Sequence, residues 1–329
     1  MDFSELNKVI DENNTFLITA HVNPDADAIG SELALYYALK ELKKEVRVIN
    51  HSETPYNLEF LDEDNIVEKF DHEKHAKVIE QSEVLFALDL NQSNRLVSME
   101  KHFLASSGIK ICIDHHPDKG EFADHFLIDT DVSATGQLIY DFIAQSQEIK
   151  LNYNMALNIY AAIITDTGAF KYDRTTPRVH YIAADLLEHG VEPSYVFDQI
   201  YDQSPIGKIK LLGFALGTMR LNKSSEIAYM TITREMLEKT GALESDVDGF
   251  VNYCLAVENV KIGLLFFELK DGIKVSFRSK GKIPINKLAA EFKGGGHLNA
   301  AGTRLFNADL NDYQKQIVNA AEKYLGGEN

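Results

Sequence analysis

Near its start the chain contains the segment Thr15-Phe16-Leu17-Ile18-Thr19-Ala20-His21-Val22-Asn23-Pro24-Asp25-Ala26-Asp27-Ala28-Ile29-Gly30-Ser31. The apolar run Thr15–Ala20 predicts a buried strand. His21, Asp25 and Asp27 follow in a loop that enters a helix predicted over Ile29–Leu42. The two carboxylates are suited to capping that helix, which is the alternative to metal binding. Three candidate ligands within seven residues favour metal binding.

Four other segments carry residues of the same kind. They are Asp89, Asp114-His115-His116, Thr165-Asp166-Thr167 and Gly294-Gly295-Gly296-His297. Most follow apolar runs, and the carboxyl ends of strands in an open α/β sheet are where ligands and catalytic groups collect. Capping of a turn or helix end remains the alternative for Asp89 and Asp166. Adjacent histidines on an extended chain point to opposite sides, so only one of the pair is expected on a given face.

The first half of the chain predicts an α/β fold built on a parallel sheet with helices on both faces. Its strands read as short apolar runs bounded by turn residues, which is typical of such a sheet. They are Thr15–Ala20, Glu45–Asn50, Val84–Leu88, Ile109–Ile113 and Phe126–Ile128. A length of 329 residues suggests two domains. We predict a catalytic domain over residues 1–190, a helical connector over 191–219 and a smaller α+β domain over 220–329.

Charge and composition limit the function. The net charge of −17 argues against a protein that grips long nucleic acid through its phosphates. Between Lys270 and Arg304, however, the sequence contains eight cationic and two acidic residues, which gives a local net charge of +6. This basic stretch suits a small polyanion, although a solvated lysine surface is the alternative.

The sequence shows neither a membrane-spanning run nor a signal peptide, which predicts a cytoplasmic protein without membrane partners. Cys112 and Cys254 lie in separate apolar contexts. We therefore expect both to be reduced core residues.

Oxygen and imidazole ligands at several strand ends suit a hard or borderline divalent cation, with Mn²⁺ a better fit than Zn²⁺. Two such ions about 4 Å apart, held by a bridging carboxylate, turn water into a nucleophile near neutral pH. They also neutralise charge that develops on a phosphoryl group. The pattern therefore predicts a metal-dependent hydrolase of phosphate esters.

In wording and spacing these segments resemble the DHH phosphoesterase superfamily. The matching motifs are His21-Val22-Asn23-Pro24-Asp25-Ala26-Asp27, Asp89, Asp114-His115-His116 and Thr165-Asp166-Thr167-Gly168. The resemblance implies one metal held by His21, Asp25 and Asp89. It implies a second metal held by Asp27, Asp89, His115 and Asp166, with Asp89 as the bridge. It further implies that His116 lies near the reacting phosphoryl group and that Asp114 orients the histidines of the site.

The C-terminal tail Gly294-Gly295-Gly296-His297-Leu298-Asn299-Ala300-Ala301-Gly302 is similar to the signature of DHHA1 domains, and Ser276-Phe277-Arg278-Ser279 to their preceding strand motif. This similarity implies a substrate site formed by Arg278, Gly294, Gly295, Gly296 and His297. Consecutive glycines let backbone N–H groups approach an anion closely, while a bare glycine turn is the alternative.

In its size and its two domains, this DHH–DHHA1 pair resembles the branch of the superfamily whose members trim very short RNA to mononucleotides and dephosphorylate adenosine 3′,5′-bisphosphate. That resemblance implies short oligoribonucleotides or small nucleotides as partners, and no long duplex. It also implies two divalent ions, Mn²⁺ first and Mg²⁺ or Co²⁺ as alternatives. Cyclic or linear dinucleotide phosphodiesterases, exopolyphosphatase-like enzymes and a non-catalytic nucleotide-binding protein remain alternatives, and a homodimer remains open.

Overall fold

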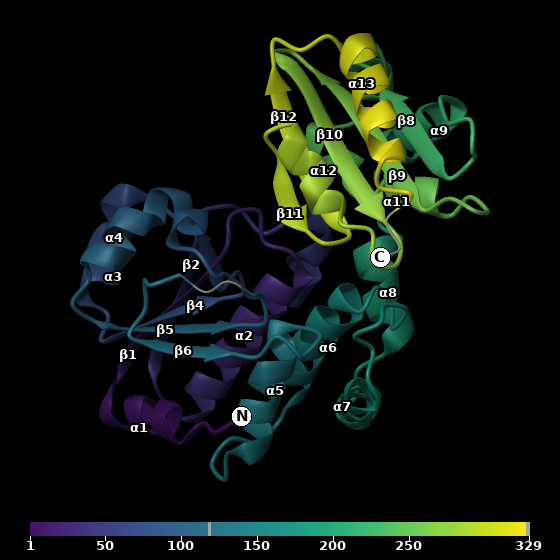
Figure 1. Cartoon of the computed structure of the whole chain (residues 1–329). Helices are drawn as coiled ribbons and strands as arrows, with labels where there is room; N and C mark the ends of the chain where they lie inside the picture. The colour runs from purple at the N-terminus through teal and green to yellow at the C-terminus, as the bar shows by residue number, and fades with distance from the viewer. Residues whose placement is uncertain (118–119, 327–329) are drawn as a thin grey trace. The chain divides into compact units, whose positions relative to one another are not determined.

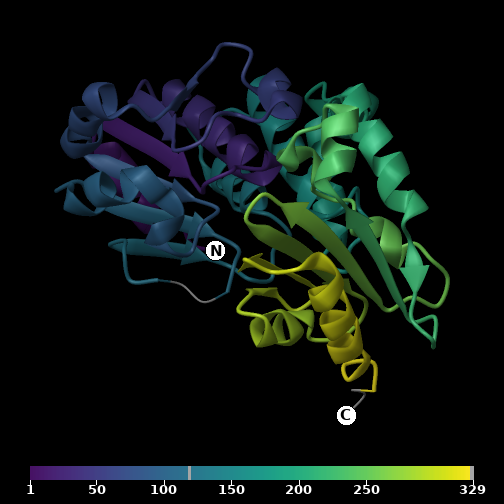
Figure 2. The same ribbon diagram turned by 90° about the horizontal axis from the view of Figure 1, so that it is seen from above.

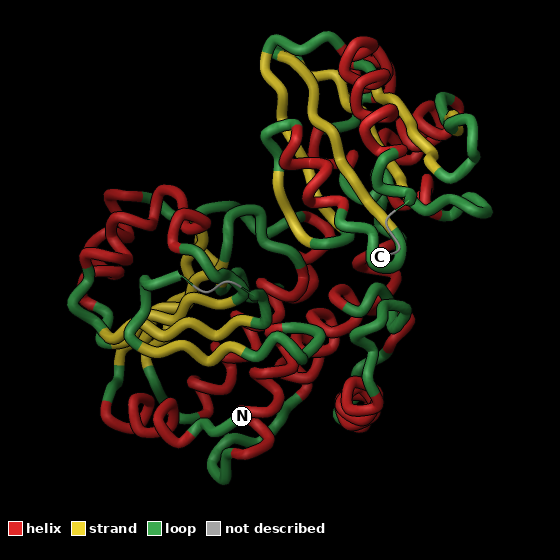
Figure 3. Tube along the Cα trace, viewed as in Figure 1, coloured by secondary structure: helices red, strands yellow, loops and turns green. Residues whose placement is uncertain are grey.

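A computed structural model describes residues 1–117 and 120–326 of the chain. These residues form two compact units, Met1–Gln203 and a second unit that begins at Ser204. Each unit has its own sheet, flanked by helices (Figures 1 and 3).

The sheet of the first unit has six parallel strands in the order β3-β2-β1-β4-β5-β6. The strands are β1 (Thr15–Ala20), β2 (Glu45–Asn50), β3 (Val67–Lys69), β4 (Val84–Leu88), β5 (Ile109–Asp114) and β6 (His125–Ile128). The strand order reverses direction between β1 and β4. In open parallel sheets such a switch point opens a crevice beyond the carboxyl ends of the strands, where ligands bind.

Both faces of this sheet are covered by helices, as the sequence predicted. On β1, Phe16 and Ile18 join one core and Leu17 joins another, because alternate side chains of a strand point to opposite faces. One face packs against α1 (Ser4–Glu12), α2 (Ala26–Glu41), α5 (Thr135–Gln145), α6 (Tyr153–Asp166), α7 (Pro177–Glu188) and the 3₁₀ helix η1 (Tyr56–Leu61). The other packs against α3 (His72–Gln81), α4 (Glu100–Ala105) and the 3₁₀ helix η2 (Ser93–Met99).

The second unit has a mixed sheet in the order β11-β12-β10-β9-β8-β7. Only the β8–β9 pair is parallel within this described sheet. Its strands are β7 (Arg220–Leu221), β8 (Ile227–Ile232), β9 (Ile262–Leu269), β10 (Gly272–Ser279), β11 (Gly295–His297) and β12 (Ala300–Phe306). Strands and helices mix as expected for the predicted α+β domain.

Helices cover both faces of this sheet as well. α12 (Ile285–Glu291) and α13 (Leu310–Glu322) share one core, and the yellow α13 runs along the sheet in both ribbon views (Figures 1 and 2). The opposite core contains α9 (Ile206–Gly217), α11 (Asn252–Leu255) and the 3₁₀ helix η3 (Glu244–Val247), with α10 (Arg234–Thr240) packed against it.

The structure divides the chain at a different place from the predicted connector over residues 191–219. Helix α8 (Pro193–Tyr201) belongs to the first unit, because Val196 is buried in its core and Tyr195 packs edge-on against Phe60. Helix α9 belongs to the second unit, because Leu211 and Ala215 are buried in that core. Each helix has enough apolar surface to join the core beside it, so no independent connector remains.

Cys112 and Cys254 are both buried, each in a different unit, and neither forms a disulfide within the described chain, as the sequence predicted. Among the described helices none is long and apolar enough to cross a membrane. The cytoplasmic location stays a prediction.

Candidate metal centre

The predicted ligands gather where β1, β4 and β5 end. These three strands are neighbours in the sheet, so the residues that follow them come together. His21 follows β1, Asp89 follows β4, and Asp114 is the last residue of β5. Asp27 lies in the first turn of α2, and Asp166 is the last residue of α6.

Asp89 lies at the middle of this group. Its Oδ2 is 3.3 Å from His21 Nε2, and its Oδ1 is 3.5 Å from both His115 Nε2 and His116 Nδ1. The Asp89 side chain is 3 % exposed, and its backbone has a left-handed φ of 56°. Non-glycine residues adopt this conformation at an energetic cost that is commonly found at functional sites. The two carboxylate oxygens thus face two different sets of neighbours.

Asp27 is completely buried and held by the start of α5. Its Oδ2 accepts a hydrogen bond from the Thr135 N–H at 2.7 Å, and its Oδ1 accepts one from the Gly136 N–H at 2.9 Å. Ser31 Oγ donates a third at 3.1 Å to Oδ1. The N-terminus of a helix favours an anion, so α5 fixes the orientation of this carboxylate.

Close packing of helices makes this arrangement possible. A Cβ atom on Gly136 would lie 2.5 Å from Ala162 Cβ, and one on Gly30 would lie 2.3 Å from the Asn158 carbonyl oxygen. Both distances are impossible for a real side chain. Glycine therefore lets α5 and α2 approach α6, which brings Asp27 and Asp166 together.

Asp25 caps α2, as the capping alternative predicted. Its Oδ1 accepts hydrogen bonds from the N–H groups of Asp27 and Ala28, both at 3.1 Å. The same carboxylate lies 4.0 Å from His21 Nε2. Capping and membership of the ligand group are therefore compatible in this structure.

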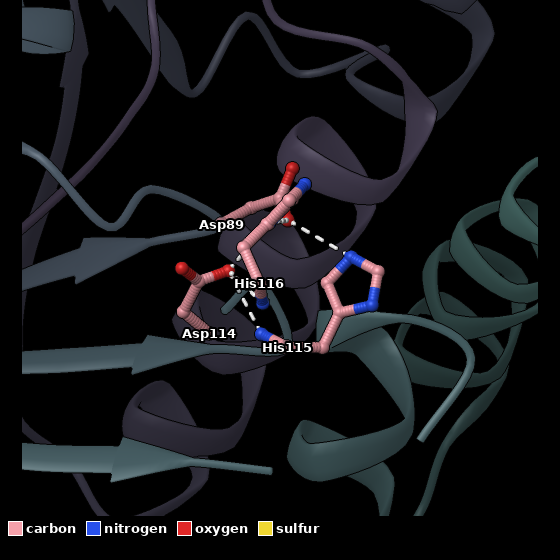
Figure 4. Close-up of side chains that lie close together, drawn as sticks. All are labelled: Asp89, Asp114, His115 and His116. Carbon is pink, nitrogen blue, oxygen red and sulfur yellow. Dashed lines mark hydrogen bonds and ion pairs between the residues drawn. The ribbon is translucent and has the colours of Figure 1, made fainter. Parts of the chain in front are cut away.

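The two adjacent histidines lie side by side, contrary to the expectation that they point apart. The rings of His115 and His116 meet edge-on with centroids 4.5 Å apart, and both approach Asp89 (Figure 4). The expectation was wrong because β5 ends at Asp114, so the alternation of an extended strand no longer applies.

Asp114 holds this turn in place. Its Oδ1 accepts hydrogen bonds from the backbone N–H groups of His115 and His116, at 2.8 and 3.2 Å. It also lies 2.8 Å from His116 Nδ1 (Figure 4). This geometry supports the orienting role that the family resemblance implied for Asp114.

Burial and mutual repulsion change the protonation of the carboxylates. Burial, followed by the charge of Asp166, raises the pKa of Asp27 to about 7. Burial and the charge of Asp25 raise the pKa of Asp166 to about 7. Burial and four neighbouring carboxylates raise the pKa of Asp89 well above its usual range. A cation among these acids would offset the repulsion and favour the charged forms.

The histidines are suited to ligation. Burial lowers the pKa of His21, so its ring is neutral at neutral pH. Its Nδ1 lies 2.8 Å from the Val22 carbonyl oxygen, which implies a proton on Nδ1 and a lone pair on Nε2 toward Asp89. Among the described residues, neither buried ring nitrogen of His115 has a hydrogen-bond partner. Such a buried polar atom is costly unless another partner satisfies it.

Three overlapping groups in the described chain have ligand atoms that all lie within 4.8 Å of one another. They are His21 with Asp25 and Asp89, then Asp27 with His115 and Asp166, and finally Asp89 with Asp114, His115 and His116. The donor set, its burial and the orphaned nitrogens of His115 fit divalent cations.

Sequence reasoning assigned no role to Ser31, Thr135 or Gly136. Thr135 also donates a hydrogen bond from Oγ1 to Asp89 Oδ1 at 3.1 Å. The available signal was the pair Thr135-Gly136, which begins α5. Its contact with Asp27, more than a hundred residues earlier in the chain, required knowledge of the helix packing.

The predicted substrate residues lie in the second unit. Ala300 on β12 pairs with Arg278 on β10 and with His297 on β11. Residues paired across neighbouring strands have side chains on the same face, so Arg278 and His297 share one face of the sheet with one strand between them.

Two of the three glycines of this segment, Gly295 and Gly296, belong to an edge strand and not to the bare turn that was the alternative. β11 begins at Gly295, and a Cβ atom on Gly294 would lie 2.3 Å from the Gly302 carbonyl oxygen. Two cations of the basic stretch are engaged elsewhere, since Arg304 pairs with Asp271 at 3.0 Å and Lys274 with Asp248 at 3.5 Å.

Comparisons with known proteins agree with this geometry. The model of the DHH family N-terminal domain matches residues 15–163, and the DHHA1 domain model matches residues 225–326. A bifunctional oligoribonuclease and PAP phosphatase NrnA from Thermus thermophilus is 31 % identical over 94 % of this chain and 89 % of its own length. This chain belongs to the DHH phosphoesterase family.

Solved structures support the assignment. An exopolyphosphatase-related protein from Bacteroides fragilis has a TM-score of 0.93 and 32 % identity, covering 98 % of this chain and 96 % of its own. RecJ in complex with Mn²⁺ from Thermus thermophilus shares the fold, with a TM-score of 0.52, 13 % identity, and coverage of 97 % of this chain and 54 % of its own. The protein is therefore a hydrolase of phosphate esters built on the DHH and DHHA1 domains.

Proposed function

We propose that this enzyme hydrolyses very short RNA to mononucleotides and removes a phosphate from adenosine 3′,5′-bisphosphate. The observation that carries the proposal is the position of Asp89. One of its carboxylate oxygens lies near His21 and the other near His115. The Thermus relative, named for these two activities, matches this chain across nearly its whole length.

Two divalent cations, Mn²⁺ first and Mg²⁺ or Co²⁺ as alternatives, would occupy the centre. His21, Asp25 and Asp89 would hold one, and Asp27, Asp89, His115 and Asp166 the other. When bound, such ions activate a water molecule and neutralise charge on the phosphoryl group. An intact set of mutually repelling carboxylates argues against the alternative of a non-catalytic nucleotide-binding protein.

The chain's own residues position the reacting groups. The N–H groups of Thr135 and Gly136 fix Asp27, and the Thr135 hydroxyl fixes Asp89. Asp114 holds His116 Nδ1, so Nε2 of that ring would be the atom that exchanges a proton with the substrate. The side chain of His116 is 21 % exposed whereas that of His115 is 7 % exposed, so His116 is the histidine better placed to meet a substrate.

The second unit would hold the substrate through its anionic groups. Arg278 is suited to gripping a phosphate with two parallel hydrogen bonds, and His297 lies on the same sheet face. As the edge strand, β11 has backbone groups on its outer side that the sheet does not use. A site of this size suits one or two phosphates better than a polymer.

A substrate panel with Mn²⁺ tests the proposal. It compares RNA of two to roughly five nucleotides, longer single strands, adenosine 3′,5′-bisphosphate, cyclic dinucleotides and polyphosphate at equal concentration. We expect the short linear RNA and the bisphosphate to be the best substrates. Activity that rises steadily with RNA length would contradict the proposal. Preference for polyphosphate would favour the exopolyphosphatase alternative, which the name of the Bacteroides structure raises.

A further inference from the structure

The turn that follows Asp166 has an unusual backbone. Gly168, Ala169 and Phe170 all have left-handed φ values, of 58°, 57° and 64°. The Tyr172 N–H then donates a hydrogen bond to the Thr167 carbonyl oxygen at 2.9 Å. The chain therefore folds back on itself directly beside a proposed metal ligand.

Tyr172 lies flat against this turn. Three of its ring carbons are 2.4 to 2.7 Å from the point where a Cβ atom on Gly168 would stand, so the absence of a side chain at Gly168 makes room for the ring. Tyr172 is nevertheless 54 % exposed. An aromatic ring that is supported on one face and accessible on the other thus lies six residues after Asp166 in the chain.

Phe170, the other aromatic residue of the turn, has a different role. Its ring stacks on His180 with centroids 5.4 Å apart and contacts Tyr160 with centroids 6.1 Å apart. Both partners lie on helices of the first unit, α7 and α6. Phe170 therefore anchors the turn, whereas much of Tyr172 remains accessible.

The turn also places this ring close to the metal centre. The ring lies against Gly168, which is only two residues after Asp166, the last residue of α6. Arg174, two residues after Tyr172 in the same segment, is exposed. An aromatic ring and a cation therefore follow Asp166 closely in the chain.

We propose that Tyr172 is a stacking platform for a nucleobase of the substrate whose phosphoryl group lies at the metal centre. Every base has a π-face, so stacking on an aromatic ring binds nucleotides with little sequence preference. The ring would let the enzyme favour nucleotides over phosphate compounds without a base. This inference rests on the proposed nucleotide substrate.

The test uses the full chain with Mn²⁺ and two related compounds. One is adenosine 3′,5′-bisphosphate, measured by its KM, and the other is its base-free analogue 1-deoxyribose 3,5-bisphosphate, measured by its inhibition constant. In Tyr172→Ala we expect KM for the nucleotide to rise about 5- to 150-fold, the range for losing one base–aromatic stack. The inhibition constant of the base-free compound should stay unchanged.

Two variants serve as controls. Tyr172→Phe retains the ring and should keep a KM close to that of the wild type. Tyr181→Ala removes a tyrosine on α7 that is 72 % exposed, and should change neither constant. Equal thermal melting curves for all three variants would show that the fold is intact.

The outcomes separate this inference from the proposed function. Suppose that the wild type hydrolyses the nucleotide. If Tyr172→Ala then leaves KM unchanged, or weakens the binding of both compounds equally, the stacking platform is wrong and the proposed function stands. If the wild type hydrolyses neither adenosine 3′,5′-bisphosphate nor dinucleotides, both are overturned.

Discussion

The two units present their functional residues in opposite ways. In the first unit, Asp27 and Asp89 are buried and fixed by neighbours that themselves cannot move without disturbing helix packing. In the second unit, Gly295, Gly296 and His297 are exposed on an edge strand. A preorganised charged centre suits chemistry, whereas an accessible strand suits the capture and release of a small anion. The comparison predicts that changes in the first unit abolish turnover and changes in the second mainly weaken binding.

The largest effect is expected from Asp89→Ala. Both proposed metal positions depend on this carboxylate, so we expect activity with Mn²⁺ to fall by more than about 10³-fold. Far-ultraviolet circular dichroism should remain unchanged, because Asp89 follows the end of β4 and belongs to neither apolar core of the first unit. Near-wild-type activity at added Mn²⁺ would show that the centre does not need this residue.

Arg278→Ala and His297→Ala should raise KM strongly. Loss of a hydrogen bond to a charged group weakens substrate binding by roughly 10- to 100-fold. We also expect kcat to fall if the energy of binding positions the phosphodiester. Arg304→Ala is the matched control in the same sheet, because Arg304 is engaged with Asp271. A loss of kcat with unchanged KM in Arg278→Ala would contradict the division between the units.

Asp114→Asn should reduce kcat about 10- to 100-fold, the range for a partner that orients a functional histidine. The reason is that the contact with His116 Nδ1 is altered. We expect Mn²⁺ binding to be retained. A normal kcat in this variant would remove Asp114 from the mechanism.

Glu32→Gln should have the smallest effect on activity and a clear effect on stability. Glu32 is completely buried with its Oε2 2.7 Å from Asn50 Nδ2, and burial raises its pKa to about 8. A raised pKa means that stability is full below the unfolded pKa of about 4.5 and declines as the pH rises to about 8.

Glutamine cannot ionise and should remove that decline. The free energy of unfolding of metal-free Glu32→Gln should exceed that of the wild type by up to roughly 5 kcal/mol at pH 9 and match it near pH 4.5. Urea denaturation at several pH values measures the difference. A difference that does not vary with pH would show that Glu32 is already ionised in the folded protein.

The regular strands of the first unit were predictable from sequence. Glu45–Asn50 and Val84–Leu88 have the predicted bounds. Val84–Leu88 is continuously apolar, as is typical of a buried parallel strand, whereas Glu45–Asn50 begins with alternating polar and apolar residues. Helix α2 begins at Ala26, earlier than the predicted Ile29, because Asp25 caps it. β11 was missed, because glycines have little intrinsic preference for strands and only the pairing with β12 makes one.

The candidate site was partly predictable for a related reason. Strand-end acids and histidines can be recognised one segment at a time, and the order of strands then brings them together. The contacts of Asp27 with Thr135 and Gly136 depend on how α5 packs against α2, which no local pattern contains. Tyr172 is another such case, because its exposure and its support by Gly168 arise only in the folded turn.

The most direct test of the account is the number of Mn²⁺ ions bound per chain, measured by equilibrium dialysis with elemental analysis. The bridged centre predicts two ions in the wild type, one in His21→Ala and none retained tightly in Asp89→Ala. A wild type that binds a single ion, or an Asp89→Ala variant that still binds two, would contradict the claim that Asp89 joins two metal positions.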